Sequence, residues 1–169
     1  MNFVKKIKKK IILKIVNLFL SGTHFFELKR KLLNSCDGIQ IKSNTKIVGP
    51  IYIPLISSLK IDNNTWIGKN MDLTGNGCVV IGAYCDIAPN VSFITGSHKI
   101  GKANHRAGEG YNGTITVGDG VWIGAGVMLL PNIQIESGTV VGAGTIVNKN
   151  LKENRVYVGN PAREIKILE

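Results

Sequence analysis

Three histidines are the side chains of this sequence best suited to move a proton near neutral pH: His24, His98 and His105. An imidazole can take the proton from an attacking hydroxyl group, which accelerates such reactions by roughly 10²–10⁴-fold. His98 is the strongest candidate for a general base, because it ends a regular repeat block and opens a polar, glycine-rich segment. Its position alone would also fit a structural or idle histidine, so its role depends on the elements around it.

The segment that follows His98, KIGKANHRAGEGYNGT, interrupts the repeat pattern. It is too long for a corner and too short for a domain, so we expect a loop ejected from a rigid scaffold at about residues 98–114. His105 fits an exposed loop residue, whereas Arg106 and Glu109 could contact an acceptor or orient His98. The sequence does not choose between these roles.

The scaffold that must position these residues has a period of six. From Ile115 to Val147, aliphatic residues recur at every sixth position: Val117, Ile123, Leu129, Ile135, Val141 and Val147. Neither an α-helix nor a plain strand has this period. An all-β solenoid does, because each short flat segment supplies one inward side chain and small residues turn each corner. The same spacing, less regular, begins near Gly38, and we expect an irregular corner at Gly75–Gly77.

The composition fits one solenoid domain. Of the 169 residues, 44% are hydrophobic but only 7% aromatic, as a narrow aliphatic core requires, and 20 glycines suit a chain with many corners. Cys36, Cys78 and Cys85 are an odd set without metal-ligand spacing, which is typical of buried thiols in a reducing cytosol. We therefore expect a cytoplasmic protein whose chemistry uses no metal.

The net charge of +10 is concentrated near the N-terminus, where residues 1–33 hold nine Lys and Arg residues and a single acid, Glu27. Residues 3–20 predict an amphipathic helix, because aliphatic residues are spaced by three or four at Val4, Ile7, Ile11, Ile15 and Leu18. This helix could pack on the solenoid end or a neighbouring subunit. Alternatively, residues 1–20 could make peripheral contact with the anionic inner face of a membrane. No aromatic-interleaved basic face supports nucleic-acid binding.

These patterns divide the chain into three parts. Residues 1–37 form a basic amphipathic helical segment, residues 38–160 the β-helix domain, and residues 161–169 a C-terminal tail. A second short helix is expected within the first part, with Thr23 as its N-cap.

The run from Val117 to Pro161, together with IGAYCDIAPNVSFITGSHKIG before it, resembles the hexapeptide-repeat acyltransferases. Within that family it looks most like the maltose and galactoside O-acetyltransferase branch, including relatives in capsule and exopolysaccharide gene clusters. The resemblance implies a left-handed parallel β-helix and a homotrimer with active sites between subunits. It also implies acetyl-CoA as cosubstrate, and it places His98 at the family's catalytic T-x-x-H position.

Further site residues follow from the same resemblance. Trp122 would line the acceptor or pantetheine channel, although it could also be a packing residue at a subunit contact. Ala125 and Ala143 would meet the pantetheine arm with their backbone groups, or could be plain corner residues. Two positions match places where relatives approach the nucleotide phosphates, and both could instead be solvated surface: Asn148–Lys149 and Lys166.

Two departures from the maltose and galactoside enzymes weaken the case for free simple sugars as acceptors. The coil between Ile67 and Ile81 looks shorter, so the acceptor-binding Asn of those enzymes cannot be aligned cleanly. Asn70 and Asn76 are the nearest candidates, and neither is in clear register. The N-terminal segment also has a lysine run that those enzymes lack. We therefore expect the acceptor to be a sugar hydroxyl of a surface glycan or its precursor.

The expected activity is direct acetyl transfer from acetyl-CoA to that hydroxyl. An N-acetyltransferase acting on an amino sugar or nucleotide-linked amino sugar is the main alternative. A metal-dependent hydratase on the same scaffold would need three converging histidines. His24 falls in a predicted helix, whereas His98 and His105 share one loop, so we do not expect the three histidines to converge on one metal ion. A non-catalytic trimerisation module remains a further alternative, which acetyl-CoA binding would separate from the enzyme.

Overall fold

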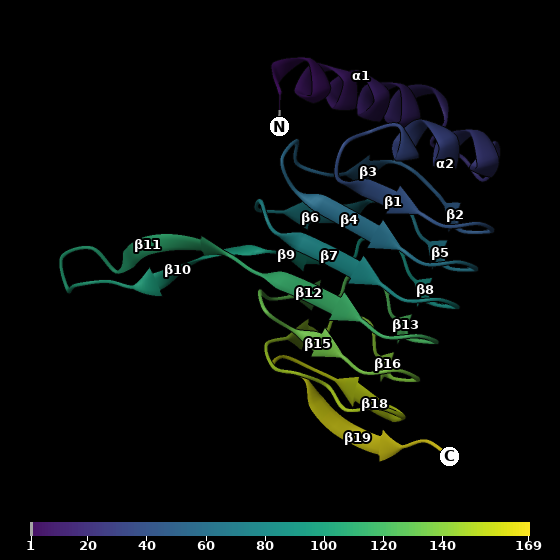
Figure 1. Ribbon diagram of the computed structural model, residues 1–169. Coiled ribbons are helices and arrows are strands. Elements are labelled where there is room, and N and C mark those ends of the chain that lie inside the picture. The colour runs from purple at the N-terminus through teal and green to yellow at the C-terminus, as the bar shows by residue number, and fades with distance from the viewer. Residues whose placement is uncertain (1) are drawn as a thin grey trace.

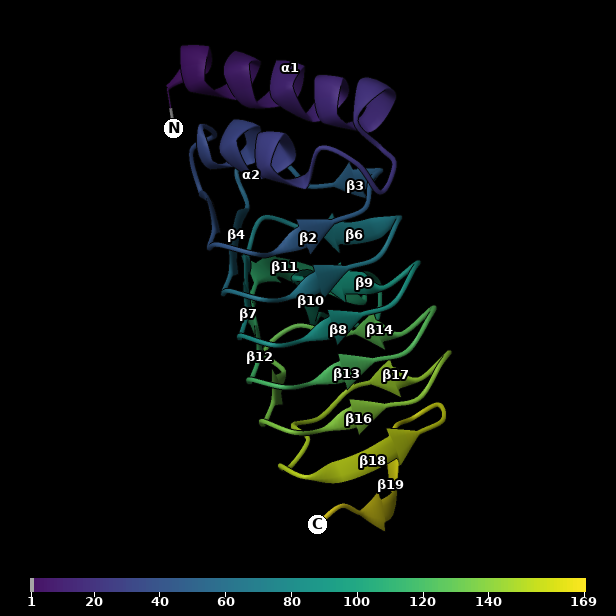
Figure 2. The ribbon, with the colours of Figure 1, turned by 90° about the vertical axis from the view of Figure 1, so that its right-hand side faces the viewer.

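The computed structural model describes residues 2–169 and shows a three-sided stack of β-coils with two helices on its first end (Figures 1 and 2). Helix α1 spans Phe3–Phe19 and helix α2 spans Phe26–Asn34. Parallel strands one coil apart pair along each wall, which confirms the expected all-β solenoid.

Each wall of the stack is one sheet, and most strands are only two to four residues long. The first wall, sheet A, contains β1 (Ile39–Ile41), β4 (Ser58–Ile61), β7 (Cys78–Ile81), β12 (Thr114–Val117) and β15 (Gln134–Ile135). Sheet B contains β2 (Lys46–Ile47), β5 (Trp66–Ile67), β8 (Asp86–Ile87), β13 (Trp122–Ile123), β16 (Val140–Val141), β18 (Arg155–Val158) and β19 (Arg163–Ile167). Sheet C contains β3 (Ile51–Tyr52), β6 (Met71–Thr74), β9 (Ser92–Ile94), β14 (Met128–Leu129) and β17 (Ile146–Val147).

The residues spaced six apart form the core. Ile41, Ile61 and Ile81 stack on one another in sheet A, and Val117 and Ile135 continue the column. Every predicted member from Val117 to Val147 is buried. Because the inward side chains of each coil stack on those of the next coil, the core is a long aliphatic stack with Phe93 as its one buried phenylalanine among the described residues.

The irregular corner lies where the sequence predicted it. Gly75 has φ +88°, and a Cβ there would lie 2.4 Å from the backbone nitrogen of Gly96, so only glycine fits. The first coils are twenty residues long, as the pairing of Leu59 with Val79 shows, whereas later coils have eighteen. The two extra residues per coil account for the change of phase in the sequence.

The segment expected as an ejected loop does leave the coils, but it is an ordered β-hairpin. Strand β10 (Gly96–Ile100) pairs antiparallel with β11 (Ala107–Asn112), and the hairpin projects well away from the stack (Figure 1). Glycines in β11 hid this strand from pattern reasoning, because they lack the alternating apolar residues that mark a half-buried strand.

The two helices cap the open end of the solenoid, where all three sheets would otherwise expose unpaired backbone groups. In each sheet, one polar side chain from the helices hydrogen-bonds to the backbone of the first strand. The Asn34 side chain exchanges two hydrogen bonds with the backbone of Ile41 in β1 (2.7 and 2.8 Å). Asn17 does the same with Ile51 in β3 (2.8 and 3.0 Å). In sheet B, the Lys29 ammonium donates to the carbonyl of Ile47 in β2.

Helix α1 packs on the solenoid through a face that the sequence pattern did not indicate. Its buried residues are Lys9, Ile12 and Val16, and the Lys9 Nζ donates to the Ser57 carbonyl oxygen at 2.9 Å. The predicted apolar stripe points outward instead. The expected N-cap of α2 is also wrong. Helix α2 begins at Phe26. The residue before it, Phe25, has the left-handed conformation, and no side chain caps the first turn.

The opposite end is closed by the C-terminal segment. Strand β19, in the predicted tail, folds back antiparallel on β18 and carries an ion pair between Arg155 and Glu164 (2.7 Å). Among residues 2–169, no helix is both long and apolar enough to cross a bilayer.

Candidate active site

His98 stands in the middle of β10, opposite Gly110 of β11. Its imidazole lies over this glycine: a Cβ added to Gly110 would be 3.7 Å from His98 Nε2. The side chain is exposed, and none of the hydrogen bonds within residues 2–169 uses it. The hairpin therefore presents an imidazole that is free to meet an incoming hydroxyl group.

The other polar residues of the hairpin make contacts of their own. Glu109 accepts an ion-paired hydrogen bond from Lys99 (2.6 Å), and Arg106 donates to the carbonyl of Gly101 (3.3 Å). His105 lies in the exposed turn. None of these contacts orients the imidazole, so the roles suggested for Arg106 and Glu109 remain predictions.

Ala125 and Ala143 lie one coil apart at the corner between sheets B and C. Each is followed by a glycine with φ +69°, and a Cβ on Gly126 or Gly144 would meet nothing within 4 Å. In the preceding coils the same left-handed position holds Asn70 and Asn90. The change from Asn to Gly removes side chains from the corner, so a ligand can approach the backbone closely.

The backbone donors of this corner are free. Neither the Ala125 N–H nor the Ala143 N–H donates a hydrogen bond to any atom of the described chain. The corner between sheets A and B differs, because there the N–H of Ala83 donates to the Asp119 carboxylate (2.7 Å) and that of Asp119 to Ser137 (3.1 Å). Two unpaired donors about 4.8 Å apart suit the amide carbonyls of an extended pantetheine arm.

Trp122 projects from β13 with 57% of its surface exposed. It lies beside Asp86 of β8, and Trp66 of β5 lies on the other side of Asp86. The two indoles and the carboxylate line a groove of 360 Å³. An aromatic face beside a hydrogen-bond acceptor suits a sugar ring. Sequence reasoning missed Trp66 and Asp86, because their alignment with Trp122 appears only when the coil lengths are known.

Asn70 is used by the fold. It occupies a left-handed corner position, and its Nδ2 donates to Oδ1 of Asn90 in the next coil (2.9 Å). Its predicted contact with an acceptor remains a prediction. On the outer face of sheet C, the carboxylate of Asp72 lies with Tyr52 in a groove of 370 Å³, and it is a second polar group that the sequence did not single out.

The positions expected near nucleotide phosphates lie toward the far end of the stack. Asn148 and Lys149 follow β17, and Lys166 lies on β19; all three are exposed. Neither lysine forms an ion pair within residues 2–169. Their ammonium groups are available to phosphate oxygens.

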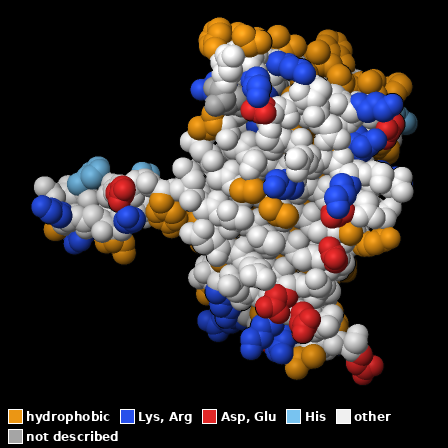
Figure 3. Space-filling model, in the orientation of Figure 1, with side chains coloured by type: hydrophobic (Ala, Val, Ile, Leu, Met, Phe, Trp, Pro, Cys, Tyr) orange, Lys and Arg blue, Asp and Glu red, His pale blue; other side chains and the backbone are white. Residues whose placement is uncertain are grey.

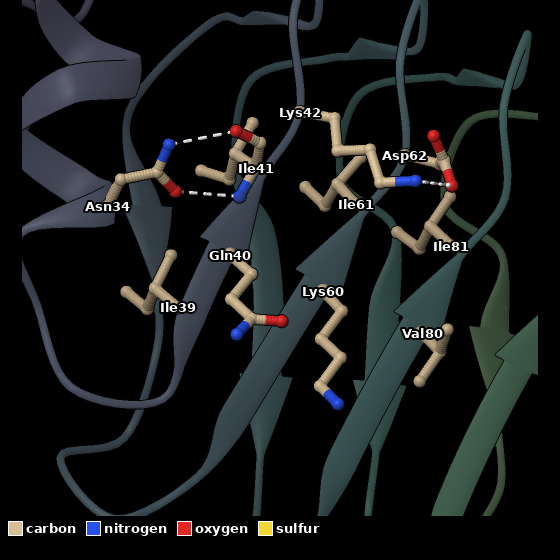
Figure 4. A pocket seen from close by; sticks show the side chains of 10 residues that line it. All are labelled: Asn34, Ile39, Gln40, Ile41, Lys42, Lys60, Ile61, Asp62, Val80 and Ile81. Carbon is tan, nitrogen blue, oxygen red and sulfur yellow. Dashed lines mark hydrogen bonds and ion pairs between the residues drawn. The ribbon is translucent and has the colours of Figure 1, made fainter.

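Two features of the chain do not fit a catalytic role. A groove of 510 Å³ on sheet A is lined by Gln40, Lys60 and aliphatic strand residues, with a Lys42–Asp62 ion pair at its edge (2.8 Å; Figure 4). It contains no histidine or cysteine.

Burial raises the pKa of both Cys36 and Cys85, which keeps these thiols protonated and unreactive. No group of His, Cys, Asp and Glu within residues 2–169 could hold a metal ion.

A single chain does not bring the predicted site together. The hairpin that carries His98 is inserted between β9 of sheet C and β12 of sheet A. Trp122 is exposed on β13 of sheet B, the wall opposite that corner. The hairpin and β13 lie on different sides of the stack (Figure 1), so His98 and Trp122 of one chain are held apart.

Residues 114–149 match the family described as "Bacterial transferase hexapeptide (six repeats)". The chain is 32% identical over 76% of its length to WcaF of Escherichia coli, a protein named for an inferred acetyltransferase role in colanic acid biosynthesis. The chain covers 69% of that protein. The chain belongs to the hexapeptide-repeat transferases. It is also 33% identical over 75% of its length to galactoside O-acetyltransferase of E. coli, of which it spans 62%.

The fold agrees with solved members of the family. A galactoside acetyltransferase in complex with coenzyme A superimposes with a TM-score of 0.85 at 29% identity, covering 98% of this chain and 82% of that one. The superposition therefore includes the coils, the helical cap and the hairpin. The solenoid agrees with what the six-residue repeat predicted, and the acetyltransferase relatives agree with the family resemblance of Val117–Pro161. The role of His98 stays a prediction.

Proposed function

We propose that this protein transfers an acetyl group from acetyl-CoA to a sugar hydroxyl, with His98 as the general base. The observation that carries the proposal is the exposed His98 imidazole, which lies over Gly110 in the hairpin and makes no hydrogen bond to any group of the described chain. The Ala125–Ala143 corner supports it by offering two free backbone donors to the pantetheine arm.

In the proposed step the acceptor oxygen attacks the thioester carbonyl carbon while His98 accepts the hydroxyl proton. The carbonyl oxygen becomes an oxyanion, which backbone N–H groups in the channel would stabilise. The carbon–sulfur bond then breaks, and the imidazolium returns its proton to the leaving thiolate. The products are an acetyl ester and coenzyme A, with no covalent acyl-enzyme.

The active site is proposed to lie between copies of the chain in a homotrimer. Because His98 and Trp122 lie on different sides of one stack, the hairpin of one copy would reach the sheet B wall of a neighbour. The Trp66–Asp86–Trp122 groove would then hold the acceptor sugar near the imidazole. Acceptors are proposed to be hydroxyls of a surface glycan or its precursor, reached from the cytoplasm.

The test is acetyl-CoA consumption with a panel of sugars, amino sugars and the surface glycan of the source organism, with product analysis for esters and amides. His98→Ala should lower kcat by roughly 10²–10⁴-fold while leaving acetyl-CoA binding and the melting temperature unchanged, because the side chain is exposed. Trp122→Ala should mainly raise KM for the acceptor. A kcat near the wild-type value in His98→Ala would contradict the assignment, and amide products alone would indicate an N-acetyltransferase.

A further inference from the structure

Helix α1 is apolar on two faces. The inner face, with Ile12 and Val16, packs on the solenoid cap. The outer face exposes a row of large aliphatic and aromatic side chains: Phe3, Val4, Ile7, Ile11, Ile15, Leu18 and Phe19. Figure 3 shows this row as a nearly continuous hydrophobic band along the helix. Exposed apolar surface of this extent on one element marks an interaction site.

The outer face cannot turn inward, because several contacts fix the roll of the helix. Asn17 exchanges two hydrogen bonds with Ile51, and Lys9 donates to the Ser57 carbonyl oxygen. Near the start of the helix, Lys5 forms an ion pair with Asp37 (3.4 Å). Rotating α1 to bury its outer row would break all of these contacts and expose Ile12 and Val16.

Lysines border the outer row on both sides. At 100° per residue, Lys8 lies on one flank of the row, and Lys10 and Lys14 lie on the other. All three are exposed, and α1 contains no acidic residue. The only acid of α2, Glu27, is already bonded to Arg30 (2.6 Å). Every charged side chain on α1 itself is therefore positive, and the nearest acid at its start, Asp37, is paired with Lys5.

We propose that the outer face of α1 docks on the surface of an anionic phospholipid bilayer. The aliphatic row would enter the boundary between headgroups and acyl chains, and Lys8, Lys10 and Lys14 would contact lipid phosphates. The charge pattern argues against a second copy as the occupant, because two α1 helices packed face to face would bring their lysine rows together. The inference is independent of the proposed catalytic chemistry.

The position of α1 suits this role. It is the outermost element at its end of the molecule and lies across the coil axis, with no strand or loop extending past it (Figure 2). The β10–β11 hairpin projects sideways from the coils and stays clear of that end (Figure 1). A bilayer could therefore meet the whole helix while the coils stand away from it.

The test is co-sedimentation of the full chain with vesicles of phosphatidylcholine containing 30% phosphatidylglycerol, or of phosphatidylcholine alone. The protein should bind the anionic vesicles and be released by salt. The variant Ile11→Ser/Leu18→Ser should lose binding at least ten-fold. Ile165→Ser/Ile167→Ser, which removes two equally exposed isoleucines at the opposite end, should bind like wild type.

A charge variant separates the two parts of the interaction. Lys8→Gln/Lys10→Gln/Lys14→Gln should weaken binding to anionic vesicles by roughly 100-fold at low salt, since each lysine near such a surface contributes about five-fold. Circular dichroism should show every variant folded. Equal binding of wild type and Ile11→Ser/Leu18→Ser would overturn the proposal. So would a change in oligomeric mass of that variant in light scattering, because the face would then be a protein interface.

Discussion

In the coils, aliphatic side chains spaced six apart are buried along the whole column, whereas on α1 those spaced by three or four are between 38% and 68% exposed. Both regions have regular apolar spacing and both are ordered. The difference lies in what surrounds them. Each coil is covered by the coils above and below it, so an inward position is always filled. Helix α1 has a neighbour on one side only.

A regular apolar pattern thus identifies a face but does not say what covers it. In the coils the covering element is the same repeat, one turn on, so the pattern is enough. Helix α1 instead packs on the solenoid through Lys9, Ile12 and Val16. These residues place an ammonium group beside the Ser57 carbonyl and two aliphatic groups over the core. The flexible stem of lysine makes such burial possible.

The largest effect expected from this comparison is on stability. Leu129→Ala and Leu18→Ala make the same chemical change in the two regions. Leu129 is fully buried in the column, so its truncation should lower the free energy of unfolding by about 2–5 kcal/mol. Leu18 is 61% exposed, and its truncation should change that free energy by less than about 0.5 kcal/mol.

Denaturant titration of the two variants measures both values. Similar losses at the two positions would mean that the outer face of α1 is covered in solution, since only a buried side chain leaves a cavity when it is shortened.

A smaller effect is expected on ligand affinity at the sheet B–C corner. Ala143→Leu adds bulk beside the free N–H groups of Ala125 and Ala143, so the dissociation constant of acetyl-CoA should rise by roughly ten-fold or more, equal to about 1.4 kcal/mol. The exposed corner has room for the side chain, so the melting temperature should hardly change. Gln134→Leu, an exposed position of the same coils on sheet A, is the matched control in isothermal titration. Unchanged affinity in Ala143→Leu would remove the corner from the cosubstrate site.

The coils could be predicted almost completely from the sequence, because inward residues that recur with a period of six leave few arrangements open. The hairpin could not, because Gly108 and Gly110 give β11 no apolar alternation, and its pairing with β10 is seen only in three dimensions. The motif indicated His98, whose catalytic role stays a prediction. Trp66 and Asp86 were not found, because their offsets from Trp122 combine a twenty-residue coil with a coil that contains the hairpin.

The smallest effect expected is a pH dependence of the free energy of unfolding, which comes from Lys9, the buried lysine of α1. Burial lowers the pKa of Lys9 below its ordinary value of 10.5, although Cys36 and Asp37 act in the opposite direction. Between the folded-state pKa and 10.5 the unfolded chain retains a proton that the folded chain has released, so the contribution of Lys9 to stability rises with pH. Below the folded-state pKa the fold carries the full cost of the buried ammonium, and above 10.5 that cost is gone.

Lys9→Met keeps the aliphatic stem and removes the charge. The free energy of unfolding of wild type, measured relative to this variant, should therefore increase as the pH rises toward 10.5, while Lys10→Met, at an exposed position, should show no such trend. Urea titrations at several alkaline pH values give the comparison. A flat difference for Lys9→Met would mean that the ammonium is solvated, and α1 would then not be fixed on the cap by its Lys9 face.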